Sequence, residues 1–126
     1  MKKSQRFSGA DRIRSFSYAL SGIVSLIKNE HNAWIHLAAL LVVIVLGFLL
    51  GIELQEWALI AAAIGLVFMA ELLNTAVERL ADYISPGHNE KIRLIKDYAA
   101  GAVLVSAVVA VVIGLVVFVP RIIALL

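Results

Sequence analysis

The sequence predicts an all-α membrane protein with three transmembrane helices preceded by an N-terminal amphipathic surface helix, forming one domain over residues 1–126. Hydrophobic residues make up 62% of the chain, and the mean hydropathy is +0.96. A soluble domain of this length could not bury so much apolar surface, because small proteins leave much of their surface exposed. Long uncharged runs recur along the chain, and nothing alternates with the period of two that a membrane β-barrel requires.

The first predicted element is a short basic helix over residues 12–28, with the sequence RIRSFSYALSGIVSLIK. Its large apolar side chains fall on one helical face, and its charged and small polar side chains fall on the other. Such a helix is expected to lie flat in the cytosolic interface of the membrane. On its own, the segment can also be interpreted as a plain membrane anchor.

Three apolar runs, over residues 34–52, 57–77 and 98–119, are predicted to cross the membrane. The first and third each hold about 20 uncharged residues, the length that a hydrocarbon core of about 30 Å requires. Gly47 and Gly51 form a GxxxG motif, and small residues let membrane helices approach closely, within a subunit or between subunits. A Ser-Pro-Gly sequence over residues 85–87 predicts a break between the second and third spans.

Positive charge is distributed unevenly among the connections. The connection between the first two spans has no lysine or arginine. The cytosolic side of a membrane protein collects these residues, so the N terminus and the second connection are expected in the cytosol and the C terminus outside. The residues that carry this argument are Lys2, Lys3, Arg6, Arg12, Arg14 and Lys28 before the first span, and Arg79, Lys91, Arg93 and Lys96 after the second.

A row of polar side chains occupies the cytosolic end of the second span. Glu71 lies fourteen residues beyond Trp57, or about 21 Å along a helix, which places it just inside the membrane boundary. Asn74 and Glu78 follow on the same helical face. An ionisable side chain within a membrane is costly and usually marks function, and a carboxylate at headgroup depth suits a general base. Glu71 can also be interpreted as a structural residue that only hydrogen-bonds a neighbouring helix.

Further charges should gather at the same depth, namely Glu30, Lys96 and Asp97. Mg²⁺ prefers oxygen ligands and typically takes one or two carboxylates together with substrate phosphates. A lysine beside such an ion can neutralise a transferring phosphoryl oxygen. This set predicts phosphoryl transfer from a cytosolic nucleotide to a lipid hydroxyl. Lys96 and Asp97 can also be interpreted as an interfacial anchor and a helix N-terminal carboxylate, and Asp82 as a solvated helix end.

Two other classes of function are compatible with a membrane carboxylate. A small proton-coupled transporter could use Glu71, but transporters place their key carboxylates near the bilayer midplane at a repeat interface, and no inverted repeat is visible here. A purely structural membrane protein would leave the face of Glu71, Asn74 and Glu78 unexplained. The chain has no cysteine, which excludes disulfides and thiolate metal sites.

Three blocks of sequence resemble the prokaryotic diacylglycerol kinase and undecaprenol kinase family of small membrane lipid kinases. They are ELLNTAVERLAD over residues 71–82, KDYAAGAVLVSA over 96–107, and the segment over 15–36 that contains SFSYALSGI and KNEHNAWIH. The resemblance implies a homotrimer in the bacterial inner membrane, with active sites shared between neighbouring subunits. It also implies ATP with Mg²⁺ as phosphoryl donor and a membrane lipid alcohol as acceptor; no nucleic-acid partner is expected.

The resemblance also implies a role for individual residues. Glu71 is the general base on the lipid hydroxyl, with Asn74 beside it, and Glu30 and Glu78 hold the Mg²⁺ bound to ATP. The remaining roles fall on Lys96 at the phosphates, on Asp97 at the nucleoside, on Tyr18, Gly87, His88 and Asn89 in the nucleotide pocket, and on Arg12, Ser17, Asn32 and His36 around the lipid headgroup.

Two positions depart from the family pattern. The family's N-terminal arginine aligns with Asp11, and Arg12 takes its place by a shift of one residue. His36 stands where the enterobacterial diacylglycerol kinases have a glutamate, whereas undecaprenol kinases of the Gram-positive type are similar to this chain. The variants ELLNTA and DYAAGAV also look more like the undecaprenol branch, so undecaprenol is favoured over diacylglycerol.

Overall fold

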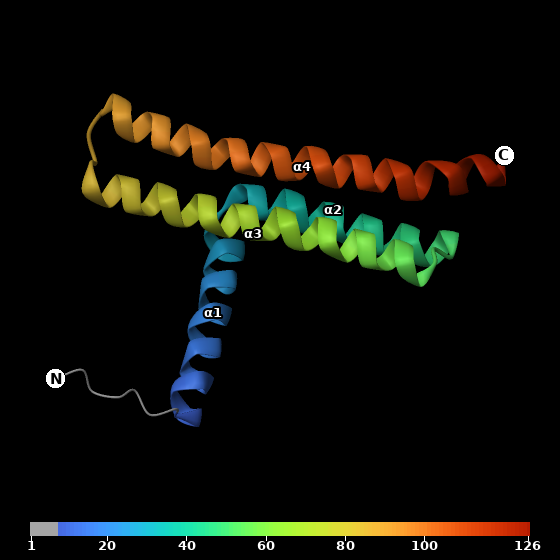
Figure 1. Cartoon of the computed structure of the whole chain (residues 1–126), viewed down its shortest axis with the longest axis horizontal. Coiled ribbons are helices and arrows are strands. Elements are labelled where there is room, and N and C mark those ends of the chain that lie inside the picture. The colour runs from blue at the N-terminus through green and yellow to red at the C-terminus, as the bar shows by residue number, and fades with distance from the viewer. Residues whose placement is uncertain (1–7) are drawn as a thin grey trace.

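The structure, a computed structural model, describes residues 8–126 as four helices (Figure 1). These are α1 (Gly9–Asn29), α2 (His31–Leu50), α3 (Leu54–Ile84) and α4 (Glu90–Leu125), and the described residues form no strand. By length and composition, α2, α3 and α4 could each cross a membrane. The predicted fold class is therefore confirmed. Lys2, Lys3 and Arg6, which entered the orientation argument, lie outside the described residues.

The second and third spans are parts of longer helices. α3 continues through the polar segment to Ile84, and α4 begins at Glu90, directly after the predicted break. Asn89 sets that start, because its Oδ1 accepts from the backbone N–H of Lys91 at 3.0 Å and of Ile92 at 3.3 Å. The predicted bounds followed only the apolar residues that a hydrocarbon core demands, whereas helical hydrogen bonding continues until a cap ends it.

α1 projects away from the three long helices instead of packing along them (Figure 1). Glu30 ends it in an extended conformation, with φ −109° and ψ 121°, and α2 starts in a new direction at the next residue. Leu26 and Ala33 are buried on either side of this joint. Nearer the N terminus, Ile13 and Phe16 remain exposed, as expected of an apolar face that would rest in lipid.

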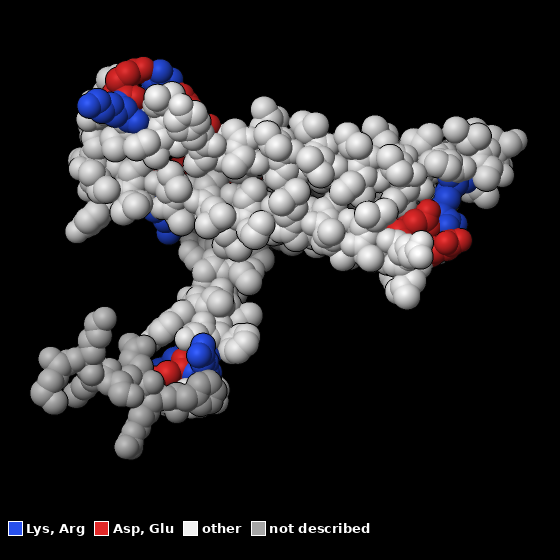
Figure 2. All heavy atoms as spheres, in the orientation of Figure 1, with Lys and Arg blue, Asp and Glu red and all other residues white. Residues whose placement is uncertain are grey.

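Charged side chains gather at the two ends of the long helices and at the free end of α1 (Figure 2). The surface between the two ends is uncharged in this view. That distribution fits a bundle whose middle part lies in hydrocarbon and whose ends reach water.

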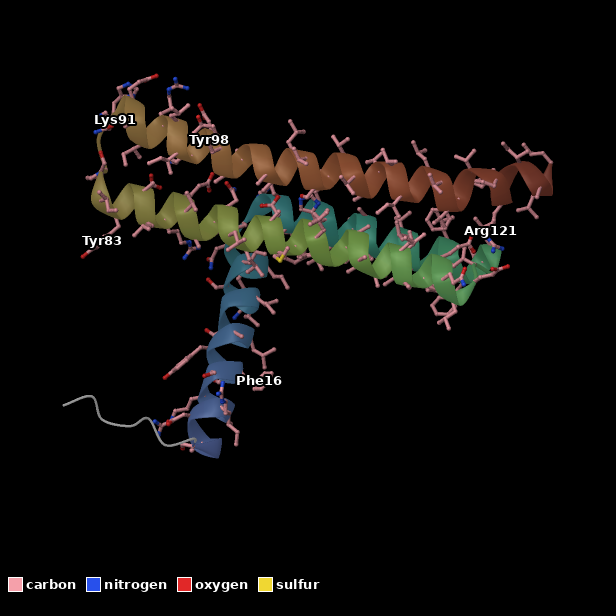
Figure 3. The ribbon with its side chains drawn as sticks, viewed as in Figure 1. Phe16, Tyr83, Lys91, Tyr98 and Arg121 are labelled. Atoms are coloured by element: carbon pink, nitrogen blue, oxygen red, sulfur yellow. The ribbon has the colours of Figure 1, made fainter. Side chains whose placement is uncertain are left out.

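The end of the bundle away from the α3–α4 loop is fixed by one close contact, one left-handed turn and the side chain of Arg121. Gly47 packs against the ring of Trp57, and a Cβ at this glycine would lie 2.5 Å from the ring. Gly51 ends α2 with a positive φ of 60°. The GxxxG motif is therefore used within the chain, for one close approach and one left-handed turn. Arg121 on α4 closes the same end by pairing with Glu56 and donating to the carbonyl of Gly51 at 3.0 Å (Figure 3).

Candidate active site

The predicted base, Glu71, is buried on α3 and paired with a histidine from α2. Only 2% of its surface is exposed. Nε2 of His36 lies 2.8 Å from Oε1 of Glu71. A carboxylate can only accept hydrogen bonds, so in the ionised pair Nε2 carries the hydrogen. Glu71 does therefore hydrogen-bond a neighbouring helix. Its partner, His36, is itself one of the predicted site residues.

His36 also lines an apolar groove between α2, α3 and α4. The imidazole meets the ring of Phe68 edge to face, with centroids 6.2 Å apart. The groove has a volume of about 380 Å³, and among residues 8–126 no Asp, Glu, Lys or Arg lines it. We refer to it as the apolar groove; besides His36 it is lined by Ala39, Leu40, Val43, Ile60, Ala63, Ile64, Val67, Phe68, Ala107, Ala110, Val111 and Gly114.

Asn74 lies one turn beyond Glu71 on α3 and faces a different neighbour. Its side chain lines a hollow between α3 and α4 together with Tyr98 and Ser106. Oδ1 of Asn74 is buried and has no hydrogen-bond partner among the described residues. Buried polar atoms nearly always have a partner. Asn74 therefore has unused capacity to accept a hydrogen bond close to the predicted base.

A polar cleft of about 470 Å³ lies where the ends of α3 and α4 meet their connecting loop. It brings together most of the residues predicted to bind nucleotide. Tyr18 and Glu30 do not line it. The predicted residues in its lining are Glu78, Gly87, His88, Asn89, Lys96 and Asp97, and the others are Asp82, Ser85, Pro86, Ile92, Arg93 and Ala100.

Ion pairs organise the charges of this polar cleft. Nζ of Lys96 donates to Oδ1 of Asp82 at 2.8 Å, so Asp82, an exposed residue near the end of α3 as expected, is also paired across the two helices. On α4, Nη1 of Arg93 donates to Asp97 at 2.8 Å, and the same guanidinium pairs with Glu90. Two cations, Lys96 and Arg93, therefore line one cleft beside carboxylates that could release them to an anionic ligand.

The two predicted metal ligands have different surroundings. Glu78 lines the polar cleft, whereas Glu30, at the α1–α2 joint, pairs with Arg79 at 3.4 Å. Over residues 8–126, no three His, Cys, Asp or Glu side chains come together as a metal-binding group. The donor set is carboxylate oxygen without thiolate, which suits Mg²⁺, an ion that commonly completes its coordination with water and substrate phosphates.

Four residues predicted to line the site are not brought to it within the chain. Arg12, Ser17 and Tyr18 are exposed on α1, and Asn32 is exposed in the first turn of α2. None of them lines the apolar groove or the polar cleft. For the three residues on α1, the physical reason is the direction of that helix, which carries them away from the bundle; Phe16 marks this position in Figure 3.

Two charged residues of the polar cleft were missed by reasoning from the sequence. Arg93 lies four residues before Asp97, a spacing that places the two on one helical face and could have indicated a pair. Asp82 had no comparable signal, because its partner Lys96 lies fourteen residues further on, across the loop. The contact between His36 and Glu71, which are 35 positions apart, likewise could not be predicted from spacing along the chain.

The chain is similar in sequence to a known protein family and to several of its members. The family described as "Prokaryotic diacylglycerol kinase" matches residues 17–118. An undecaprenol kinase of Bacillus subtilis is 42% identical over 108 residues, covering 86% of this chain and 88% of the relative. A diacylglycerol kinase of Synechocystis is 35% identical over 113 residues, covering 89% of this chain and 65% of the relative. One from Haemophilus influenzae is 35% identical over 95 residues, with coverages of 75% and 80%.

Proposed function

The chain belongs to the prokaryotic diacylglycerol kinase family and is a membrane lipid kinase; from this premise we propose that it transfers the γ-phosphoryl group of ATP to the hydroxyl of undecaprenol. The observation that carries the proposal is the buried Glu71 carboxylate next to the apolar groove, with the polar cleft at the end of the same helix. The similarity to the Bacillus enzyme favours undecaprenol over diacylglycerol.

Glu71 is the base of the proposed reaction. Its carboxylate accepts the proton of the lipid hydroxyl as the hydroxyl oxygen attacks the γ-phosphorus. The bond from the γ-phosphorus to the bridging oxygen breaks, and ADP leaves. Positioned general bases contribute about 10²–10⁴-fold to such rates. Asn74, whose Oδ1 has no partner among the described residues, has the capacity to accept a hydrogen bond beside the base.

The polar cleft is the proposed nucleotide site. Lys96 and Arg93 supply positive charge to the phosphates once their carboxylate partners release them, and charge-assisted hydrogen bonds of this kind are among the strongest in proteins. The backbone of the loop over residues 87–89 and the side chain of Asp97 would contact the nucleoside. Tyr18 would reach the nucleotide from α1 of a neighbouring subunit.

Mg²⁺ is the proposed cofactor, and Glu78 and Glu30 are its proposed ligands. When bound, the ion would neutralise charge on the phosphates during transfer. Glu78 lines the polar cleft, which supports its role. Glu30 would have to exchange its present partner Arg79 for the ion.

A homotrimer with shared sites is part of the proposal. It would bring α1 of one subunit, with Arg12, Ser17 and Tyr18, to the bundle of the next. Asn32 would then border the lipid headgroup beside them. The excess of positive charge on the polar-cleft side favours a cytosolic N terminus and a C terminus outside, in the bacterial inner membrane.

The test is phosphate transfer from labelled ATP with Mg²⁺ by purified protein in mixed micelles. We expect kcat/KM for undecaprenol to exceed that for diacylglycerol, and the Glu71→Gln variant to lose about 10²–10⁴-fold in kcat. Glu53→Gln, the same change at an exposed carboxylate beyond the opposite end of α3, is the matched control and should stay active. A preference for diacylglycerol would replace the lipid assignment, and transfer to neither lipid would refute the proposal.

A further inference from the structure

The hydrogen bond between His36 and Glu71 has a consequence for the geometry of the proposed base. The His36 side chain is 20% exposed and that of Glu71 only 3%, so water competes little with their contact. Oε1 of Glu71 lies 2.8 Å from Nε2 of His36. The contact with His36 is thus made by Oε1 and not by Oε2. The two oxygens of one carboxylate therefore have different environments.

The imidazole is itself held in place. Phe68, one turn before Glu71 on α3, meets the ring edge to face at an interplanar angle of 67°. His36 is also the polar member of the apolar groove lining. The imidazole of His36 thus reaches from the Glu71 carboxylate to the apolar groove. Because His36 lies on α2, it holds the Glu71 side chain of α3 from a neighbouring helix.

We propose that His36 is a positioning residue for phosphoryl transfer: its Nε2–H holds Oε1 of Glu71, so that Oε2 is the oxygen that accepts the proton of the lipid hydroxyl. This inference rests on the proposed function. In this role His36 acts by orienting Glu71 and does not itself contact the lipid headgroup. A base displaced by about 1 Å can lose up to about 10²-fold in rate, so orientation of one carboxylate is a measurable contribution.

Two near-isosteric substitutions separate this role from a merely structural one. The amide nitrogen of glutamine stands at the same number of bonds from Cβ as Nε2 of histidine, whereas that of asparagine corresponds to Nδ1. His36→Gln can therefore still donate to Oε1 of Glu71, and His36→Asn cannot. Both variants keep a polar side chain at the end of the apolar groove.

The experiment measures kcat and the KM values for Mg·ATP and for lipid in both variants and in the wild-type protein. We expect His36→Asn to lower kcat by about 10–100-fold with both KM values unchanged, and His36→Gln to recover most of that loss. His31→Asn, at an exposed histidine of the same helix, is the control and should match the wild type. The inference would be overturned if His36→Asn had the same kcat as the wild type, or if its only change were a higher KM for lipid. Neither result would contradict the proposed function.

Nitrogen-15 NMR of the histidine-labelled protein in micelles tests the contact without turnover. The chain has three histidines. We expect the Nε2 resonance of His36 to report a bonded hydrogen and to shift in the Glu71→Gln variant, while the resonances of His31 and His88 stay in place. An unchanged His36 resonance would refute the contact. Transfer to no lipid by the wild-type protein would instead refute the proposed function, and the catalytic role of His36 with it.

Discussion

Glu71 and Lys96 illustrate how individual side chains in this protein are held by tertiary partners. Glu71 is buried against His36, and Lys96 crosses from α4 to Asp82 on α3. A buried carboxylate needs a donor because an unpaired charge in a medium of low polarity is costly. The Lys96–Asp82 pair is different, because both groups are accessible from the polar cleft and a phosphate could displace the carboxylate.

The exchange of partners at Lys96 can be tested by removing each member of the pair. Lys96→Gln removes the proposed phosphate contact and should raise the KM for Mg·ATP by about tenfold or more, as expected when a charge-assisted hydrogen bond is lost. Asp82→Asn frees the ammonium group and should leave that KM unchanged or lower it. Steady-state kinetics at saturating lipid measure both.

Lys91 provides the matched control. It lies on the same helix but does not line the polar cleft (Figure 3), so Lys91→Gln should leave the KM for Mg·ATP unchanged. An equal rise in KM for the Lys96 and Asp82 variants would mean that the pair only stabilises the cleft, and would contradict a phosphate role for Lys96.

At the scale of the helices, one short turn and one close contact set how α2 and α3 approach each other. The α2–α3 turn depends on Gly51 in its left-handed conformation, and Gly47 lets α2 reach Trp57. Trp57 in turn packs on Phe48, with ring centroids 5.0 Å apart. The ring therefore has little room to move, and any added atom at Gly47 must displace packed groups.

Gly47→Ala should consequently destabilise the protein by about 1–3 kcal/mol, the usual cost of overpacking. The matched control is Gly65→Ala on α3, where an added Cβ would meet nothing within 4 Å. That change should be neutral or stabilise by up to about 1 kcal/mol, because alanine favours the helix more than glycine does. Reversible unfolding in detergent micelles measures the difference, and equal stability of the two variants would contradict the close-approach argument.

At the scale of the whole molecule, α1 is the element whose position is least explained by one chain. The three long helices pack together, while α1 projects from them (Figure 1), and most of its apolar residues, though not Leu26, are exposed. The membrane surface accounts for that apolar face. A neighbouring subunit would account for the distance between Ser17 or Tyr18 and the rest of the proposed site.

Mixed oligomers test whether sites are shared. Glu71→Gln and Tyr18→Ala chains, each of low activity alone, are unfolded together and refolded as mixed oligomers. If α1 of one subunit completes the site of the next, the mixture should regain activity above either parent, because some sites then contain both native residues. The control is Glu71→Gln protein refolded with itself, which should stay inactive. Absence of recovery in verified mixed oligomers would argue that each site is built within one subunit.

The sequence by itself determined the class of the protein, its three spans, the break after Ile84 and the row of polar residues along α3. These features are local: hydropathy over about 20 residues decides a span, and Glu71, Asn74 and Glu78 follow one another at helical spacing along a single segment. The tertiary structure decided which partners those residues have. His36 and Glu71, or Asp82 and Lys96, meet only because α2, α3 and α4 pack side by side, and the direction of α1 follows from one extended residue, Glu30. Contacts between helices depend on packing in three dimensions, which no periodicity along the chain encodes.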